Sequence, residues 1–407
     1  MEWPISIQIS KNMKRVLFVC SLYHPHVGGI ETMVTELSQF YRGQGVESVV
    51  LTKKWPTTLT EEDDHENTKI YRVVSARTET EFSDVIEWAK NNENKIKADI
   101  IHVIGVRRPL PLIGLLLSRH WNVPLISTIA GSEIPNTGDS ETKAVWNESK
   151  EMMEPILKSS SIVTCVSKAL ENDLRKIVPN LDYVRTIYAG IDTELINSAL
   201  CTETEKDYIV SLRRLTPSKG VDILIRAFKD IANEHPQIRL LIAGEGDEEE
   251  NLKALARDLN LDDKIKFIGT VPLTRAISLL KGAICTVVPS ISEGGSLVNI
   301  EAQAASCPVV ASRVGGIPEY VQDGVSGLLF ESKSPKDLAD KIKIIISNTP
   351  LRNKLIQGGV EYANKFSWGI LGPQYLSLYN EMIDVKRIKP FQPWSELTKR
   401  LWLELKK

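Results

Sequence analysis

Short apolar runs alternate with amphipathic helical segments along nearly the whole chain, and this alternation narrows the available folds more than any other feature. The runs are unbroken and rich in β-branched residues, which is typical of parallel strands buried on both faces of a sheet. The simplest fold for such a chain is the doubly wound α/β type, and the series of strands and helices occurs twice.

A polar stretch at 201–207 separates the two series. We therefore expect a first Rossmann-like domain over 1–196, a second over 197–368 and a C-terminal helical segment over 369–407. In such sheets, ligands bind at the carboxyl ends of the strands. The expected strands are 15–20, 49–52, 70–74, 100–104, 125–128 and 162–166 in the first domain and 208–212, 238–243, 265–268, 284–288 and 309–311 in the second, with helices at 221–231, 251–259 and 298–305.

Composition agrees with a soluble protein of several domains. The 407 residues suffice for two or three domains of ~150 residues each. Hydrophobic residues make up 42% and charged residues 25%, which argues against a disordered, collagen-like or coiled-coil chain. The formal net charge is −2, so no overall field favours nucleic acid.

The sequence predicts a cytoplasmic location. The longest strongly apolar stretch, 110–117, is broken by Pro111 and Gly114 and is far shorter than the ~20 residues of a membrane span. The N-terminal residues include no early Lys or Arg and no apolar core, so we expect no signal peptide. Four of the five cysteines lie in apolar or small-residue surroundings and are expected to be buried thiols.

The C-terminal segment allows two interpretations. An amphipathic pattern after Trp368 is expected to return across the first domain, with Leu371, Tyr375, Leu378 and Met382 on one face. The tail 386–407 carries seven Lys or Arg residues interleaved with Trp and Leu. Either this tail packs on the first domain or it contacts an anionic membrane surface, since a basic amphipathic helix suits both.

The densest chemical signal lies at 289–316. An expected strand ends at Val288, a glycine-bearing loop follows, and a helix is expected to begin near Ser296. The free amide N–H groups of that helix start, beside Gly294 and Gly295, form a site for an anion.

Two carboxylates flank this expected anion site. Glu293 lies in the loop and Glu301 about one turn into the helix. Because a carboxylate accepts two hydroxyl hydrogen bonds at once, one can face a sugar and the other a ribose diol. The alternative is an ordinary strand-to-helix turn with two solvated glutamates.

The second signal is RRLTPSKG at 213–220, after the strand that ends at Leu212. Arg214 and Lys219 lie five residues apart across a turn that contains proline. Two cations at that place neutralise a diphosphate, which gains negative charge as it leaves. The alternative is a surface loop with solvated basic side chains.

The third signal is HPHVGG at 24–29, before the first expected helix. Gly28 and Gly29 let a diphosphate approach the backbone and the helix start. The stretch lacks the GxGxxG dinucleotide pattern, and the other GxG, at 244–246, has Glu249 in the third position. A dehydrogenase is therefore disfavoured.

The sequence predicts no metal site and no cofactor. His24 and His26 are two apart in a loop without a carboxylate nearby, which favours exposed histidines over metal ligands. The chain also has no GxxxxGK[ST], HExxH, GxSxG or Asp-x-Asp motif, so metal-bridged phosphoryl or glycosyl transfer is disfavoured.

Together these motifs resemble family 4 of the retaining nucleotide-sugar glycosyltransferases. The resemblance implies the GT-B fold, in which two Rossmann-like doubly wound domains face each other across a cleft, and it implies transfer without a metal. It covers nearly the whole chain. The matching segments are Gly28-Gly29, RLTPSKG at 214–220, AGEGDEEENL at 243–252, FIGTV at 267–271, Glu293 with Glu301, PVVASRVGGIPEYVQDGVSGLLF at 308–330 and Phe366-Ser367-Trp368.

The resemblance also implies roles for individual residues. Arg214 and Lys219 would hold the donor diphosphate, Glu301 would bind the ribose and Glu293 would contact the donor sugar. The candidate catalytic residues are thus Glu293, Arg214 and Lys219, and the donor-binding residues are Gly28, Gly29, Arg214, Lys219, Gly295, Ser296, Leu297, Val298 and Glu301.

The chain departs from the family pattern in the first domain. Ala130 stands where the family often has His in a TxHGSD stretch. A retaining transfer in which the leaving phosphate takes the acceptor proton would tolerate this loss. His102, at the end of a neighbouring strand, either substitutes for that His or is a structural residue.

Milder departures concern the donor geometry. Gly295-Ser296 replaces an aromatic-glycine pair, and Arg213 stands where a Gly often precedes the Arg. Ser306 replaces a glycine that often ends the helix, and Ala189 replaces the Asn of an Asn-Gly-Ile-Asp turn.

We expect transfer of a sugar to a saccharide or lipid-linked acceptor, in cell-surface polysaccharide or glycolipid synthesis. The alternatives are a nucleotide-sugar epimerase or hydrolase of the same fold, or a non-catalytic or partner-dependent relative. Arg107-Arg108, the apolar run 110–117 and Arg119 form either a surface for a lipid-linked or phosphate-bearing acceptor at the inner face of the membrane, or an ordinary buried helix.

Overall fold

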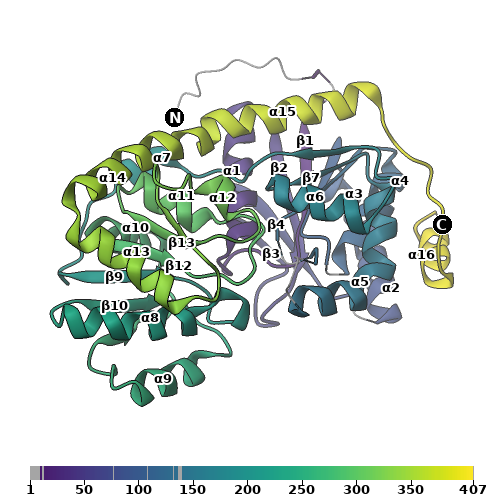
Figure 1. Ribbon diagram of the computed structural model, residues 1–407. Helices are drawn as coiled ribbons and strands as arrows, with labels where there is room; N and C mark the ends of the chain where they lie inside the picture. The colour runs from purple at the N-terminus through teal and green to yellow at the C-terminus, as the bar shows by residue number, and fades with distance from the viewer. Residues whose placement is uncertain are drawn as a thin grey trace. The chain divides into compact units, whose positions relative to one another are not determined.

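The computed structural model describes residues 10–11, 13–76, 78–107, 109–131, 133–135 and 140–406. The chain forms two compact units: Met1–Ala189 with Trp368–Lys407, and Gly190–Ser367 (Figure 1). The first boundary lies at Ala189 and not after residue 196. The reason is that Ile191 donates its N–H to the carbonyl of Phe366 at 2.9 Å, which fastens this segment to the second unit.

The first unit contains a sheet in the order β3-β4-β2-β1-β5-β6-β7-β8. It is parallel except for β3, an edge strand that pairs antiparallel with β4. The sequence pattern missed β3 because its residues, EDDH, include no apolar run. The strands are β1 Arg15–Val19, β2 Glu47–Lys53, β3 Glu62–His65, β4 Thr68–Val73, β5 Ile100–Ile104, β6 Leu125–Ile129, β7 Ile162–Cys165 and β8 Val184–Thr186.

Helices cover this sheet. The apolar run 110–117 lies in α4 and is buried, and the Arg119 guanidinium is buried and donates to the Ser159 carbonyl. The interpretation of this run as an exposed acceptor or membrane surface is therefore wrong. Its flanking Arg108, and residues 1–9 of the N-terminus, lie outside the described residues. The helices are α1 Gly29–Gly43, α2 Glu79–Asn91, α3 Glu93–Ile96, α4 Leu110–Trp121, α5 Ser140–Ser159, α6 Lys168–Ile177, α15 Trp368–Val385 and α16 Glu396–Lys406.

The second unit contains an all-parallel sheet in the order β11-β10-β9-β12-β13-β14. Together the two sheets confirm the predicted doubly wound α/β fold. The strands are β9 Tyr208–Leu212, β10 Arg239–Ala243, β11 Ile265–Phe267, β12 Cys285–Val288, β13 Val309–Ser312 and β14 Leu328–Phe330; the helices are α7 Thr193–Ser198, α8 Val221–Glu234, α9 Glu249–Asp258, α10 Leu273–Gly282, α11 Leu297–Ala304, α12 Ile317–Tyr320, α13 Pro335–Ser347 and α14 Thr349–Ala363.

The C-terminal helices pack on the first unit. Helix α15 contacts α1, and the predicted apolar face of α15 is buried. Helix α16 contacts α2 and α4, and its Leu401 and Leu405 are buried. The basic Arg400 forms an ion pair with Glu79 of α2 at 2.9 Å. The structure thus shows the packed arrangement of the tail.

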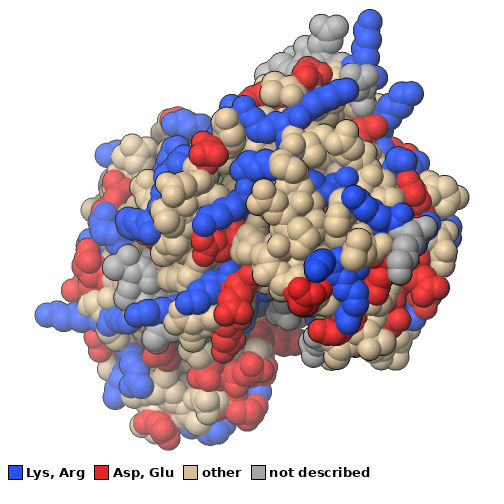
Figure 2. All heavy atoms as spheres, turned by 90° about the vertical axis from the view of Figure 1, so that its right-hand side faces the viewer, with Lys and Arg blue, Asp and Glu red and all other residues tan. Residues whose placement is uncertain are grey.

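Figure 2 shows Lys and Arg side chains interspersed with Asp and Glu on one face of the molecule. None of the helices in the described ranges is long and apolar enough to cross a membrane. Four cysteines are buried thiols, as predicted, and Cys201 is exposed.

The packing of α16 leads to a stability prediction. Leu401→Ala is expected to lower the free energy of unfolding by ~2–4 kcal/mol, because it removes buried methyl groups and leaves a cavity against α2. The matched control is Leu403→Ala on the same helix, where Leu403 is 52% exposed. This control should change stability by less than ~0.5 kcal/mol. Urea unfolding of both variants checks the prediction, and equal effects would contradict it.

Candidate active site

The second sheet places the candidate site at its topological switch point. Strand order runs from β9 toward β10 and β11 on one side and from β12 toward β13 and β14 on the other. The loops that follow β9 and β12 therefore lie side by side at the carboxyl edge of the sheet, where doubly wound sheets bind ligands. A hydrogen bond of 2.9 Å from the Ile291 N–H to the Ser218 carbonyl joins these two loops.

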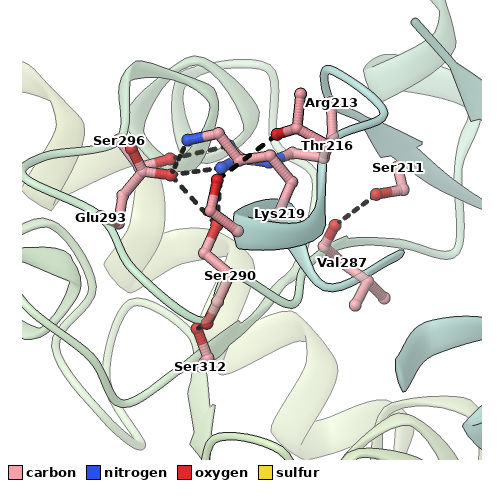
Figure 3. Close-up of polar contacts among 10 residues, drawn as sticks. Ser211, Arg213, Thr216, Lys219, Val287, Ser290, Glu293, Ser296 and Ser312 are labelled. Atoms are coloured by element: carbon pink, nitrogen blue, oxygen red, sulfur yellow. Dashed lines mark hydrogen bonds and ion pairs between the residues drawn. The ribbon is translucent and has the colours of Figure 1, made fainter. Parts of the chain in front are cut away.

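Three side chains converge on the carboxylate of Glu293 (Figure 3). The Arg213 guanidinium forms an ion pair with Glu293 Oε2, and Lys219 Nζ lies 2.9 Å from the same oxygen. The Ser290 hydroxyl donates to that oxygen at 3.0 Å. The Gly316 N–H donates to the Glu293 carbonyl at 3.1 Å, so the loop after β13 also holds this residue.

The charges in this cluster keep Glu293 ionised. Burial alone would raise the pKa of Glu293, but its attraction to Lys219 and Arg213 and their hydrogen bonds outweigh burial and lower the pKa to about 2. Burial and the neighbouring Arg213 lower the pKa of Lys219, while Glu293 opposes them. The site thus holds one carboxylate between two cations.

Glycines allow the neighbouring loops to come close to the loop after β9. Gly220 has φ +62°, and a Cβ there would clash with the Pro289 carbonyl oxygen. Gly244 has φ +135°, and a Cβ there would clash with the Arg213 carbonyl oxygen. The GxG at 244–246 therefore serves close backbone packing against the loop after β9.

Helix α11 presents its first turn at the same edge. Ser296 is the N-cap residue, but its side chain caps no backbone N–H. Instead, the Ser296 hydroxyl accepts a hydrogen bond from Arg213 Nη1 at 3.4 Å. The first-turn N–H groups of Leu297 and Val298 have no partner within the helix, so they provide donors for an anion.

Glu301 lies one turn further along α11 and is partly exposed. Burial raises its pKa to about 7, and attraction to Arg213 opposes this rise. Gly295 precedes the helix, and a Cβ there would lie 2.8 Å from the Tyr320 hydroxyl oxygen. A side chain at that position would thus crowd the Tyr320 ring.

The structure brings together some of the predicted residues and adds others. Lys219, Glu293 and Ser296 belong to one cluster, whereas Arg214 is exposed and forms no ion pair with a carboxylate of any described residue. Arg213 and Ser290 were not predicted as site residues. The signal for Arg213 is its place directly after β9, at the strand end where ligands bind.

Gly28 and Gly29 lie in the first unit, where α1 begins after β1. They are at the switch point of that sheet, since β1 neighbours both β2 and β5. Gly28 is the N-cap residue of α1, and a Cβ there would lie 2.5 Å from a carboxylate oxygen of Glu31. Glu31 also bonds His26 Nδ1 at 3.0 Å. The Glu31 carboxylate therefore lies at the start of α1, where a diphosphate was expected.

Metal-ligand geometry is not found at the loop histidines. His24 stacks on His65 with the ring centroids 3.9 Å apart. Within the described part of the chain, no group of three or more His, Cys, Asp or Glu side chains could hold a metal ion.

The surroundings of Ala130 include a carboxylate that the sequence did not single out. Glu133 is buried and accepts hydrogen bonds from the N–H groups of Ala130 and Gly131, at 3.2 and 2.7 Å. His102 is buried, contacts the Tyr379 hydroxyl and lies 2.6 Å from Thr128 Oγ1. Burial lowers the pKa of His102 to about 3, so its ring is neutral and has a structural role.

Sequence comparisons support the resemblance over nearly the whole chain. Residues 27–195 match the family model described as Glycosyltransferase Family 4, and residues 192–361 match Glycosyl transferases group 1. The chain is 31% identical to an uncharacterized glycosyltransferase of Methanocaldococcus jannaschii, over 89% of this chain and 97% of that protein. It is 28% identical to a D-inositol 3-phosphate glycosyltransferase of Corynebacterium glutamicum, over 67% of this chain and 70% of that protein.

Solved structures share the fold. Sucrose-phosphate synthase from Thermosynechococcus elongatus matches with a TM-score of 0.76 at 19% identity, over 91% of this chain and 100% of that chain. Anabaena HepE in complex with UDP-glucose matches with a TM-score of 0.70 at 20% identity, over 91% and 98% of the two chains.

The raised pKa of Glu301 predicts how stability depends on pH. As pH rises from 4.5 to about 7, an unfolded Glu301 loses its proton while the folded one keeps it, so the free energy of unfolding falls. The glutamine of the Glu301→Gln variant cannot ionise. The variant should therefore lack this decrease in the free energy of unfolding. Since one pKa unit corresponds to ~1.4 kcal/mol, the variant should gain ~1–3 kcal/mol over the wild type between about pH 4 and about pH 8. Urea unfolding across this range checks it, and a difference that is constant with pH would contradict it.

Proposed function

Because the chain belongs to family 4 of the glycosyltransferases and has the GT-B fold, we propose that it transfers a sugar from a nucleoside-diphosphate sugar, with retention of configuration and without a metal. The observation that carries this proposal is the cluster of Arg213, Lys219 and Glu293 at the switch point of the second sheet. The proposed acceptor is a saccharide or a lipid-linked molecule.

The cluster suits a nucleoside diphosphate. Lys219 and the exposed Arg214 provide positive charge on the loop after β9, and the amides of Leu297 and Val298 provide neutral donors. A diphosphate is best held by such a combination of cations and helix-start amides. Glu301, one turn along α11, would accept hydrogen bonds from the ribose hydroxyls through its ionised carboxylate.

These residues would also promote departure of the diphosphate. Negative charge grows on the leaving phosphate, and prearranged cations and amides stabilise it in the transition state. Glu293 would accept hydrogen bonds from the donor sugar and so hold the anomeric carbon in place. Because Ala130 provides no base, the leaving phosphate would take the proton of the acceptor hydroxyl.

The relatives guide the choice of substrates for testing. HepE is described in complex with UDP-glucose, which makes UDP the first nucleotide to examine. The D-inositol 3-phosphate glycosyltransferases suggest an acceptor that carries phosphate. We further propose that the product belongs to a cell-surface polysaccharide or glycolipid, made by an enzyme that is cytoplasmic and peripheral on the inner face of the membrane.

Donor binding is tested by calorimetry with UDP, GDP, ADP and NAD, each with and without EDTA. One nucleoside diphosphate is expected to bind equally well in EDTA. Lys219→Met should weaken that binding by ~10–100-fold, because a charge-assisted hydrogen bond contributes ~1.5–3 kcal/mol. The matched control is Lys229→Met, an exposed lysine on α8 of the same unit, which should bind like the wild type.

Other outcomes of this titration overturn parts of the proposal. Binding of NAD alone would contradict a glycosyltransferase donor site. Binding that disappears in EDTA would contradict metal independence. Product analysis with the matching nucleotide sugar then tests transfer: conversion of the sugar without any acceptor would indicate an epimerase or hydrolase.

A further inference from the structure

We propose that Arg213 is a positioning residue of this site. It holds one oxygen of the Glu293 carboxylate, so that the other oxygen faces the donor sugar and Lys219 stays available to the diphosphate. This inference rests on the proposed function, because it takes the donor as the ligand.

The side-chain hydrogen bonds of the Glu293 carboxylate involve one of its two oxygens. Among the described residues, every side chain that bonds this carboxylate does so at Oε2: Arg213, Lys219 and Ser290. The Glu293 side chain retains 11% exposure. Since an ionised carboxylate offers about four acceptor positions, Oε1 can accept sugar hydroxyls while Oε2 stays held.

Arg213 is fixed more firmly than Lys219. Its Nη2 atom bonds both Glu293 and the Ser290 hydroxyl, the latter at 2.6 Å, and its Nη1 atom bonds Ser296 at 3.4 Å. The Arg213 side chain is only 6% exposed. These three partners all lie in the loop between β12 and α11, so the planar guanidinium is fastened to that loop.

Lys219 keeps donors to spare. Its ammonium has three N–H donors, and Glu293 takes one of them. A pair of Lys219 and Glu293 alone would carry no net charge, and the exposed Arg214 would be the other cation of this loop. Arg213 supplies the second positive charge, so the three side chains together keep a net charge of about +1 for an anionic donor.

Ser290 completes the arrangement. Its hydroxyl accepts from Arg213 and donates to Glu293, which closes a triangle of hydrogen bonds. Its carbonyl accepts from the Ser312 hydroxyl at 2.6 Å, which ties the triangle to the end of β13. The position of the carboxylate is thus determined by the ends of three neighbouring strands.

The test compares Arg213→Met and Arg213→Lys with the wild type and with Arg226→Met, an exposed arginine of α8 that serves as the charge-matched control. Binding is measured by calorimetry at several pH values. The ligands are UDP and UDP-glucose or, if the wild type binds another nucleoside diphosphate, that diphosphate and the corresponding glucose nucleotide. Arg213→Met should weaken diphosphate binding about tenfold and reduce the additional affinity that the sugar gives to the nucleotide sugar. Arg213→Lys should restore the diphosphate affinity in part but not the extra affinity.

The pH profile separates positioning from simple loss of structure. Without Arg213, burial is opposed by one cation fewer, so the pKa of Glu293 rises and the sugar-dependent affinity is lost at higher pH than in the wild type. Ser290→Ala, a smaller change, should shift the profile in the same direction. Arg226→Met should match the wild type in every measurement.

The outcomes distinguish the two proposals. Wild-type binding with an unchanged affinity and pH profile in Arg213→Met and Ser290→Ala would overturn the positioning role and leave the proposed function standing. Absence of any diphosphate binding by the wild type would overturn the proposed function and this inference with it.

Discussion

The second unit depends on the pairing of one buried carboxylate with two cations. An ionised carboxylate is costly to bury alone, and removing one partner of a buried pair leaves a charge without compensation. Glu293 comes from the loop after β12, while Arg213 and Lys219 come from the loop after β9. The ion pairs therefore connect two segments that are distant in sequence, and the close approach of Gly220 to the Pro289 carbonyl oxygen joins the same two segments.

The sheet order explains why this pairing occurs at the edge where doubly wound sheets bind ligands. β9 and β12 are hydrogen-bonded neighbours, yet the connections that leave them proceed to opposite sides of the sheet. Their common carboxyl edge is therefore the switch point, the place where doubly wound sheets bind ligands. The same topology occurs in the first unit between β1 and β5, where α1 begins at Gly29 and Glu133 lies near Gly105.

Periodicity in the sequence was sufficient for the fold but not for the details of the site. Unbroken apolar runs predicted most of the strands, because both faces of these sheets are buried; β3 lacks such a run. The sequence pointed to Arg214 as a site residue, whereas the structure places Arg213 in the cluster. To distinguish the two arginines, one must know in which direction each side chain points beyond the end of β9. Ser211 already bonds the Val287 carbonyl of β12 at 2.9 Å, and Arg213 is two residues later, on the same side of an extended chain. Glu133 was missed because its partners are backbone N–H groups, which leave no motif.

Two departures from the family pattern, which look independent in the sequence, meet in the structure. Arg213 replaces a glycine and Ser296 replaces another, and the guanidinium of the first donates to the hydroxyl of the second at 3.4 Å. With glycine at position 213, Lys219 would be the only cation bonded to Glu293 among the described residues, and this pair would carry no net charge. Arg213 adds the missing charge, and Ser296 gives its second nitrogen a partner that glycine lacks. The two substitutions thus meet in one contact, which under the proposed function alters how the donor is held while the charge of the site still suits a diphosphate.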